Sequence, residues 1–173
     1  MLKSFLKYFT GETVNPTSSW LPQNLGTPIL RLREGAVGEL RFGSLFDQAQ
    51  VFGRPESFRR HSEQYCELLY SAAGFQIDYE QGKLAYVAYF IGPDTHLPAE
   101  QVVFCTPKLS SGLLLTRSTS EQELTASLGK PASVDRDSDE TVLCYKCGML
   151  TLEFELSGAG ELKRLNAYPT KTA

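Results

Sequence analysis

The chain has few residues of the kinds that usually carry metal or nucleophile chemistry. It contains two histidines and four cysteines among 173 residues. Histidine is the commonest general base and, with cysteine, a main zinc ligand. The chain therefore offers few candidate residues for a catalytic triad or for a zinc site. Basic residues are not in excess, because the net charge is -3 and the pI about 5.5. A nucleic-acid binder usually carries a basic stripe, so we expect no nucleic-acid partner.

Long hydrophobic runs are also missing. No apolar run in the chain approaches the ~18 residues of a membrane span, so we expect no stable membrane insertion. In "MLKSFLKYFTGE", Lys3 and Lys7 interrupt the apolar residues, unlike the continuous stretch of a secretory signal. We therefore expect a cytoplasmic protein with free thiols. A short amphipathic helix is indicated by the helical spacing of four residues, Leu2, Phe5, Leu6 and Phe9.

Two stretches, one in each half of the chain, share a pattern that ends a helix. "VFGRPES" begins at position 51 and "SLGKPAS" at position 127. Gly53 and Gly129 suit the backbone conformation that closes a helix, and Pro55 and Pro131 prevent it from resuming. We therefore interpret these glycines and prolines as structural residues that end one helix in each half.

The starts of these helices and the strands that follow them are also visible. Ser44 and Ser120 each open a helical pattern, and Glu123 stands at capping-box spacing after Ser120. "GFQIDYE" at 74–80 and "MLTLEFEL" at 149–156 alternate apolar and polar residues. This alternation predicts half-buried antiparallel strands with one polar face.

These patterns predict an α+β fold built from two tandem repeats that pack together. Each repeat is a short helix plus an antiparallel meander of three to four strands, with "GELRF" and "GLLLT" as extra strands before the helices. Whether the repeats form one sheet or two is left open. The predicted segments are an N-terminal leader with the amphipathic helix at 1–27, a first repeat at 28–94, a connector at 95–111 that holds the strand "QVVFC", a second repeat at 112–169 and a tail at 170–173.

The strand, the short helix, the Leu/Phe-Gly-basic-Pro stop and the hairpin, used twice over residues 38–169, resemble the beta-lactamase-inhibitor-protein-like fold. Small bacterial outer-membrane assembly lipoproteins use one copy of a similar unit. Members of this group bind proteins and are not enzymes. The resemblance implies a sheet surface that binds a protein, without indicating which protein.

Carboxylates fall on the predicted polar faces of equivalent strands in the two halves. They are Asp78, Glu80, Glu153 and Glu155. If the sheets join, these residues form an acidic band that attracts a basic partner. The same pattern is also typical of the solvated side of an ordinary sheet.

The last strand of each half adds aromatic residues. Tyr86 and Phe90 share one face of "KLAYVAYFIG", while Arg164 and Tyr168 occupy the matching strand in the second half. Tyrosine and arginine are enriched at binding hot spots. We therefore count these four residues as candidate partner contacts, although coverage by the connector or, as we favour, by the other half also explains an apolar face.

The remaining candidates are cysteines and histidines. Cys144 and Cys147 match half of a zinc knuckle, but a structural zinc site needs four ligands. Strand residues three apart point to opposite faces, so one buried and one exposed thiol is the expected arrangement. His61 and His96 lie in predicted polar loops. We expect no catalytic residue, metal or cofactor.

The sequence predicts a non-enzymatic protein-binding module that presents a sheet surface to a partner, which a basic protein would suit. An inhibitor or a toxin-immunity protein would use such a surface. The alternative is a small-molecule binder or an enzyme that uses a cleft between the halves, which requires a pocket with converging polar groups. A zinc module is a third alternative. The sequence leaves the oligomeric state open.

Overall fold

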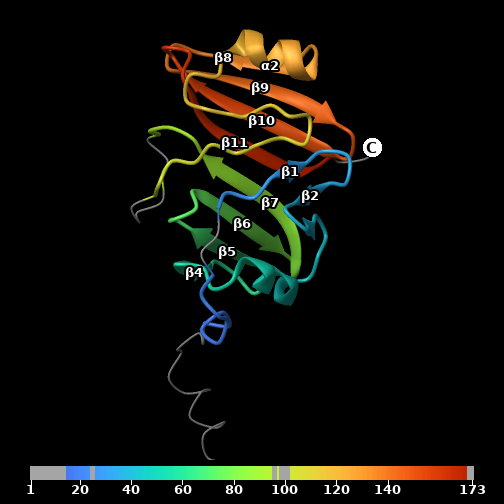
Figure 1. Cartoon of the computed structure of the whole chain (residues 1–173), viewed down its shortest axis with the longest axis vertical. Helices are drawn as coiled ribbons and strands as arrows, with labels where there is room; N and C mark the ends of the chain where they lie inside the picture. The colour runs from blue at the N-terminus through green and yellow to red at the C-terminus, as the bar shows by residue number, and fades with distance from the viewer. Residues whose placement is uncertain (1–14, 24–25, 95–96, 98–101, 171–173) are drawn as a thin grey trace, which may run out of the picture.

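The computed structural model describes residues 15–23, 26–94, 97 and 102–170, and an eight-stranded antiparallel sheet is its main feature (Figure 1). Its strand order is β4-β5-β6-β7-β11-β10-β9-β8. The strands are β4 Ser57–Arg60, β5 Tyr65–Tyr70, β6 Phe75–Glu80, β7 Lys83–Phe90, β8 Ser133–Arg136, β9 Glu140–Cys147, β10 Leu150–Ser157 and β11 Leu162–Pro169. The predicted strands at 74–80 and 149–156 are therefore confirmed as β6 and β10.

The two halves of the chain meet where β7 pairs with β11. This pairing is antiparallel and runs from Val87 opposite Ala167 to Phe90 opposite Arg164. Backbone hydrogen bonds therefore continue from β4 to β8 across the junction. The question that the sequence left open is answered: the strands of both halves form one sheet.

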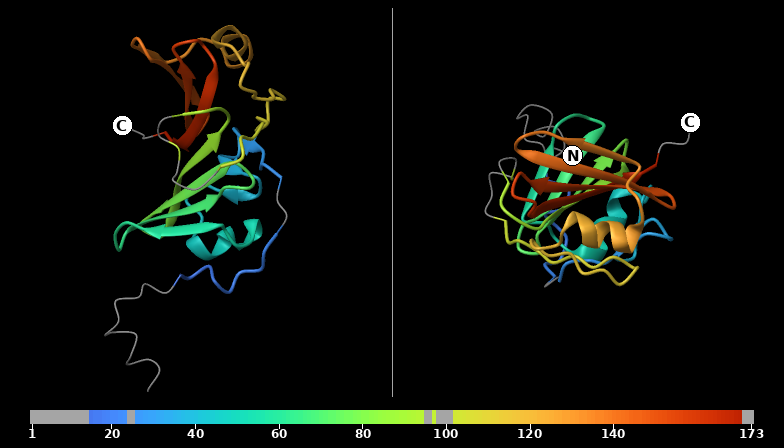
Figure 2. Two further views of the ribbon diagram at one scale, coloured as in Figure 1. Left: turned by 90° about the vertical axis from the view of Figure 1, so that its left-hand side faces the viewer. Right: turned by 90° about the horizontal axis from the view of Figure 1, so that it is seen from above.

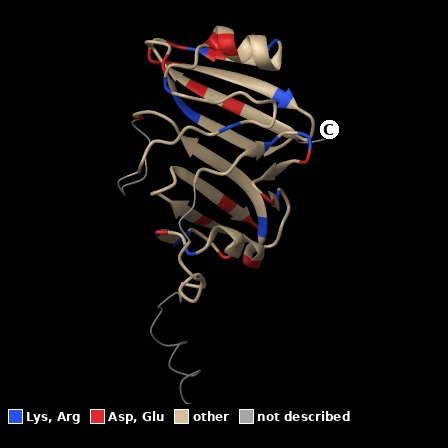
Figure 3. Cartoon of the chain, in the orientation of Figure 1, with Lys and Arg blue, Asp and Glu red and all other residues tan. Residues whose placement is uncertain are grey.

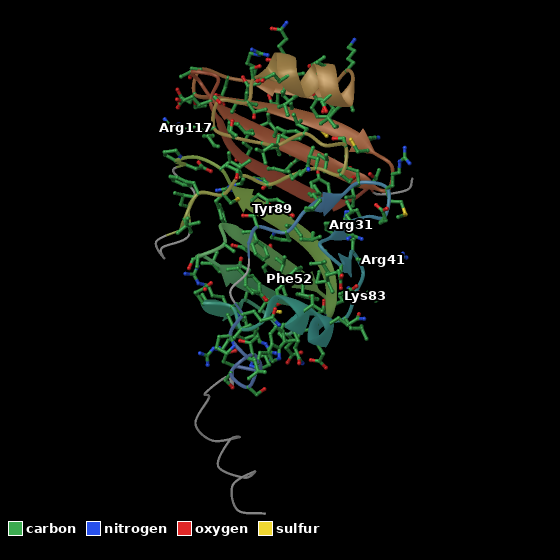
Figure 4. All side chains as sticks on the ribbon, in the orientation of Figure 1. Arg31, Arg41, Phe52, Lys83, Tyr89 and Arg117 are labelled. Carbon is green, nitrogen blue, oxygen red and sulfur yellow. The ribbon has the colours of Figure 1, made fainter. Side chains whose placement is uncertain are left out.

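One face of this sheet is covered by a second layer (Figure 2). The layer contains the 3-10 helix η1 (Phe46–Phe52), the helix α2 (Glu121–Leu128) and a three-stranded sheet of β1 (Leu30–Arg31), β2 (Ala36–Val37) and β3 (Leu40–Arg41). Phe52 of η1 and Tyr89 of β7, both labelled in Figure 4, belong to the main hydrophobic core. Burial of such large apolar side chains is the main stabilising contribution to folding.

The helix ends follow the sequence signals closely. Ser120 caps α2, and Glu123 completes the capping box by accepting from the Ser120 backbone N–H at 2.8 Å. Gly129 and Gly53 end the two helices with positive φ angles of 84° and 72°. The first helix begins one residue later than predicted, because its N-terminal cap is Leu45 and not Ser44.

The predicted α+β class, with two helix-plus-meander repeats packed together, is wrong. The described structure is mostly β, with eleven strands and two short helices. The helices contain seven and eight residues, so they cover part of one sheet face and form no layer of comparable size. The strands do not divide into two packed units either, because β7 and β11 join them edge to edge.

The other predicted strands are shorter than predicted or do not form. Of "GELRF", only Leu40–Arg41 forms a strand, and it belongs to the small sheet. Within "GLLLT", Leu114 makes an isolated bridge to Lys108, and the described part of "QVVFC" is not a strand. The amphipathic helix predicted from Leu2, Phe5, Leu6 and Phe9 lies outside the described residues. None of the described helices has the length and apolarity that crossing a membrane requires.

Candidate binding surface

The face of the sheet opposite the helices carries every residue that the sequence singled out as a partner contact. We call it the open face. Register fixes its members, since Asp78 lies opposite Tyr86, and Arg164 lies opposite both Phe90 and Glu155. The alternate positions of the same strands, such as Ile77, Val87 and Leu165, are buried in the main core. The eight predicted residues on the open face are Asp78, Glu80, Tyr86, Phe90, Glu153, Glu155, Arg164 and Tyr168.

One end of the open face is covered by the connector. Leu69, Ala88 and Phe90 form a second hydrophobic cluster, against which Leu97 and Val102 pack. Phe90 is only 3% exposed as a result. Phe90 is therefore not available to a partner, and of the two segments that could cover it, the other half and the connector, the connector does so.

Arg164 lies next to this covered end and forms an ion pair with Asp94, a residue that the sequence analysis did not single out. Its Nη2 lies 2.6 Å from Asp94 Oδ2, and its Nε lies 3.9 Å from Glu155 Oε2. The guanidinium also lies 5.6 Å from the centroid of the Phe90 ring, within cation–π range. Burial raises the pKa of Glu155, while Arg164 and Asn166 oppose the shift. Arg164 is thus a structural ion-pair partner in this chain.

A side-chain hydrogen bond crosses the β7–β11 junction and continues into β10. Tyr86 donates its hydroxyl proton to Asn166 Oδ1 at 2.6 Å, and Asn166 donates in turn to Glu155. Tyr168 donates to Glu153 at 2.5 Å. The rings of Tyr86 and Tyr168 lie nearly parallel, with centroids 6.5 Å apart and an interplanar angle of 16°.

Asp78 occupies the centre of the β6 part of this face. The sequence predicted an outward, solvated carboxylate, but Asp78 is only 4% exposed. Tyr65 donates to its Oδ2 at 2.7 Å and Gln76 donates to its Oδ1 at 2.8 Å. Burial raises the pKa of Asp78 to about 6, and these hydrogen bonds and His61 reduce the shift. The pKa of Tyr65 is raised too, by burial and by its bond to Asp78.

An open pocket of about 810 Å³ lies between these groups. We call it the tyrosine pocket. Both halves of the chain line it, because its residues come from β5, β6 and β7 and from the end of β11. Its lining residues are Tyr65, Gln76, Asp78, Glu80, Ala85, Tyr86, Tyr168 and Pro169.

The structure brings some predicted residues together and separates others. Asp78, Glu80, Tyr86 and Tyr168 surround the tyrosine pocket, and Glu153 is joined to it through Tyr168. Phe90, Arg164 and Glu155 lie apart, near the connector. The sequence analysis overlooked Tyr65, Gln76 and Asn166. The alternation of "EQYCELLY" opposite "GFQIDYE" could have placed Tyr65 on the same face as Glu80, which it pairs with.

The cysteines and His61 show no metal centre. Cys144 pairs with Glu153 of the open face, whereas Cys147 packs against the main core, so the two point to opposite faces as predicted. Both are half-buried free thiols, which corrects the expectation of one buried and one exposed. Within the described ranges, no group of three or more potential ligands could hold a metal. His61 Nε2 lies 3.0 Å from Glu67 Oε1, and His96 lies outside the described residues.

Comparison with known proteins gives a likeness of fold. No protein-family model and no curated protein matches the chain. A similar solved structure is the crystal structure of a DUF4309 family protein (YjgB) from Bacillus subtilis subsp. subtilis str. 168. The superposition has a TM-score of 0.52 at 16% sequence identity and covers 78% of this chain and 84% of that one. At this identity the two proteins share a fold, and the comparison carries no function from one to the other.

Proposed function

We propose that this protein is a non-enzymatic binding protein that presents the open face of its sheet to a protein partner. The observation that carries the proposal is the composition of that face. Aromatic side chains and carboxylates from both halves gather on it, while the covering helices lie on the other side. A sheet face of this kind offers tyrosine contact area in a rigid frame, which suits recognition of a partner surface.

The carboxylates in and beside the tyrosine pocket favour a basic partner. Acidic residues occur on β6 and β10, on both sides of the β7–β11 junction (Figure 3). Arg164 is neutralised by Asp94 and Glu155, so it adds little positive field. Complementary charge accelerates association and selects partners of the opposite sign. An inhibitor or an immunity protein that works in the cytoplasm would fit this proposal, and the four free thiols support a reducing compartment.

Capture from native lysate with matched variants tests the proposal. Glu80→Lys reverses one exposed charge on the open face, and Glu39→Lys makes the same change in the exposed turn between β2 and β3. We expect one stoichiometric protein, identified by mass spectrometry, to bind the wild type and the Glu39→Lys variant at low salt. It should be lost with Glu80→Lys and at high salt. Equal capture by all three proteins would contradict a role for the open face.

A further inference from the structure

The tyrosine pocket combines tyrosine rings with carboxylates, and this combination indicates a particular class of ligand. We infer that it binds one organic cation, a guanidinium or alkylammonium group, between its tyrosine rings and its carboxylates. This inference rests on the proposed function where the cation is an arginine or lysine side chain of the partner. A free amine compound offers the same chemistry.

The charges that line the pocket have one sign. Asp78 and Glu80 are acidic, and none of the described lining residues is basic. Lys83 stands opposite Glu80 in the β6–β7 hairpin but does not line the pocket. Glu153 adds a carboxylate behind Tyr168. The field inside the pocket therefore favours a positive ligand.

Asp78 has no cationic partner of its own in the part of the chain that the structure describes. Both hydrogen bonds that its carboxylate accepts come from neutral groups, the Tyr65 hydroxyl and the Gln76 amide. Among the described residues, no lysine or arginine lies within ion-pair distance of it, and nearby His61 pairs with Glu67. A carboxylate that is 4% exposed is costly to ionise without a counter-charge. A bound cation would supply that charge.

The hydrogen-bonding capacity of the pocket also selects a donor. The hydroxyl protons of Tyr65, Tyr86 and Tyr168 are donated to Asp78, Asn166 and Glu153 respectively. Each phenolic oxygen keeps lone pairs that can accept. A guanidinium or ammonium brings only donors, whereas a phosphate or carboxylate ligand would meet more acceptors. The nearly parallel rings of Tyr86 and Tyr168 offer π faces, which attract cations.

The pocket is larger than a single cation, because its volume lies within the range of pockets that hold drug-sized ligands. Its volume of about 810 Å³ is open to solvent on one side, so a single cation would keep part of its hydration. We expect weak binding of an isolated cation and stronger binding when a peptide on the open face delivers it.

Small charged probes test this inference directly. Binding of N-acetyl-arginine amide, N-acetyl-lysine amide and putrescine is followed by NMR chemical shifts of the intact protein. N-acetyl-citrulline amide is the neutral control, because it matches arginine in size but lacks the charge. We expect the cations to shift resonances of Tyr65, Tyr86 and Tyr168. Citrulline should bind at least tenfold more weakly. Equal binding of citrulline and arginine would overturn the inference.

Matched variants locate the binding. Asp78→Asn and Glu80→Gln should each raise the dissociation constant of the arginine probe at least threefold, and Glu39→Gln should leave it unchanged. Glu80 is exposed, so its variant keeps the test valid if Asp78→Asn disturbs the fold. Unchanged affinity in Glu80→Gln and a folded Asp78→Asn would refute the site.

Two further comparisons separate the sources of the cation and the two proposals. Tighter binding of an arginine-containing decapeptide than of the amide identifies a protein side chain as the ligand, and tighter binding of putrescine identifies a free amine. Either result supports a cation site. If the lysate partner binds through the open face but no cationic probe does, the proposed function stands and this inference fails.

Discussion

Replacing Asp78 by asparagine removes a buried carboxylate and keeps the size of the side chain. Burial raises the pKa of Asp78 in the folded protein from 3.8 to about 6. Folding therefore favours the protonated acid, and the stabilising contribution of this group is complete below about pH 4. It is lost as the pH rises through 6, because the unfolded chain then holds the ionised form at lower cost.

The size of the effect follows from the shift. One pKa unit corresponds to about 1.4 kcal/mol, so a shift of about two units changes the free energy of unfolding by about 3 kcal/mol. Most of this change, about 2.5 kcal/mol, falls between pH 4 and pH 8. The asparagine of the variant does not titrate, and its amide can exchange hydrogen bonds with Tyr65 and Gln76.

Urea denaturation at several pH values measures this difference. Contributions of other groups are common to both proteins, so the difference between the wild type and Asp78→Asn isolates Asp78. We expect the variant to gain about 2.5 kcal/mol relative to the wild type between pH 4 and pH 8. Curves that run parallel over this range would refute the reasoning, since the carboxylate would then be no costlier to ionise in the folded protein.

Four other single substitutions and one double variant test the fold. Gly74 and Gly82 share a φ angle of 74°, but a Cβ at Gly74 would lie 2.4 Å from a backbone oxygen, whereas a Cβ at Gly82 would meet open space. Gly74→Ala should therefore lower the free energy of unfolding by at least ~2 kcal/mol, and Gly82→Ala should lower it by about 1 kcal/mol, as thermal unfolding would show. Ser120→Ala removes the cap of α2 and should cost about 1 kcal/mol in denaturant unfolding. Asn166→Ala removes the acceptor of the half-buried Tyr86 hydroxyl and the donor to Glu155 and should cost about 2 kcal/mol. Tyr86→Phe combined with Asn166→Ala should cost less than the sum of the two single changes.

Local features of the fold could be predicted from the sequence, and the long-range ones could not. The alternation in β6 and β10 and the cap of α2 depend on neighbouring residues, which the sequence displays directly. The pairing of β7 with β11 depends on which apolar face meets which strand edge, and both faces of β7 carry apolar residues. The predicted fold class was wrong for a related reason. A helical pattern in the sequence shows how long the helix is, but it does not show how large a sheet that helix lies on.

On the candidate surface, too, local features could be predicted and long-range contacts could not. Register places Asp78, Tyr86 and Tyr168 on one face, whereas the sequence predicted only which residues alternate within each strand. The connector was one of two possible covers for the face of Phe90, and the choice of Leu97 and Val102 could not be made from the sequence, since nothing in the connector specifies the strand on which it lies. The buried state of Asp78 has the same origin, because Tyr65 and Gln76 flank it only after β5 and β6 pair.

The β7–β11 junction joins residues that are far apart along the chain, such as Tyr86 and Asn166, which are 80 positions apart. The hairpins on either side are local and can form early, whereas this junction must wait for the most distant part of the chain. The tyrosine pocket contains groups from both sides of it. A chain that lacks β11 therefore lacks part of the tyrosine pocket, and the binding that we propose there would begin only after β11 has joined the sheet.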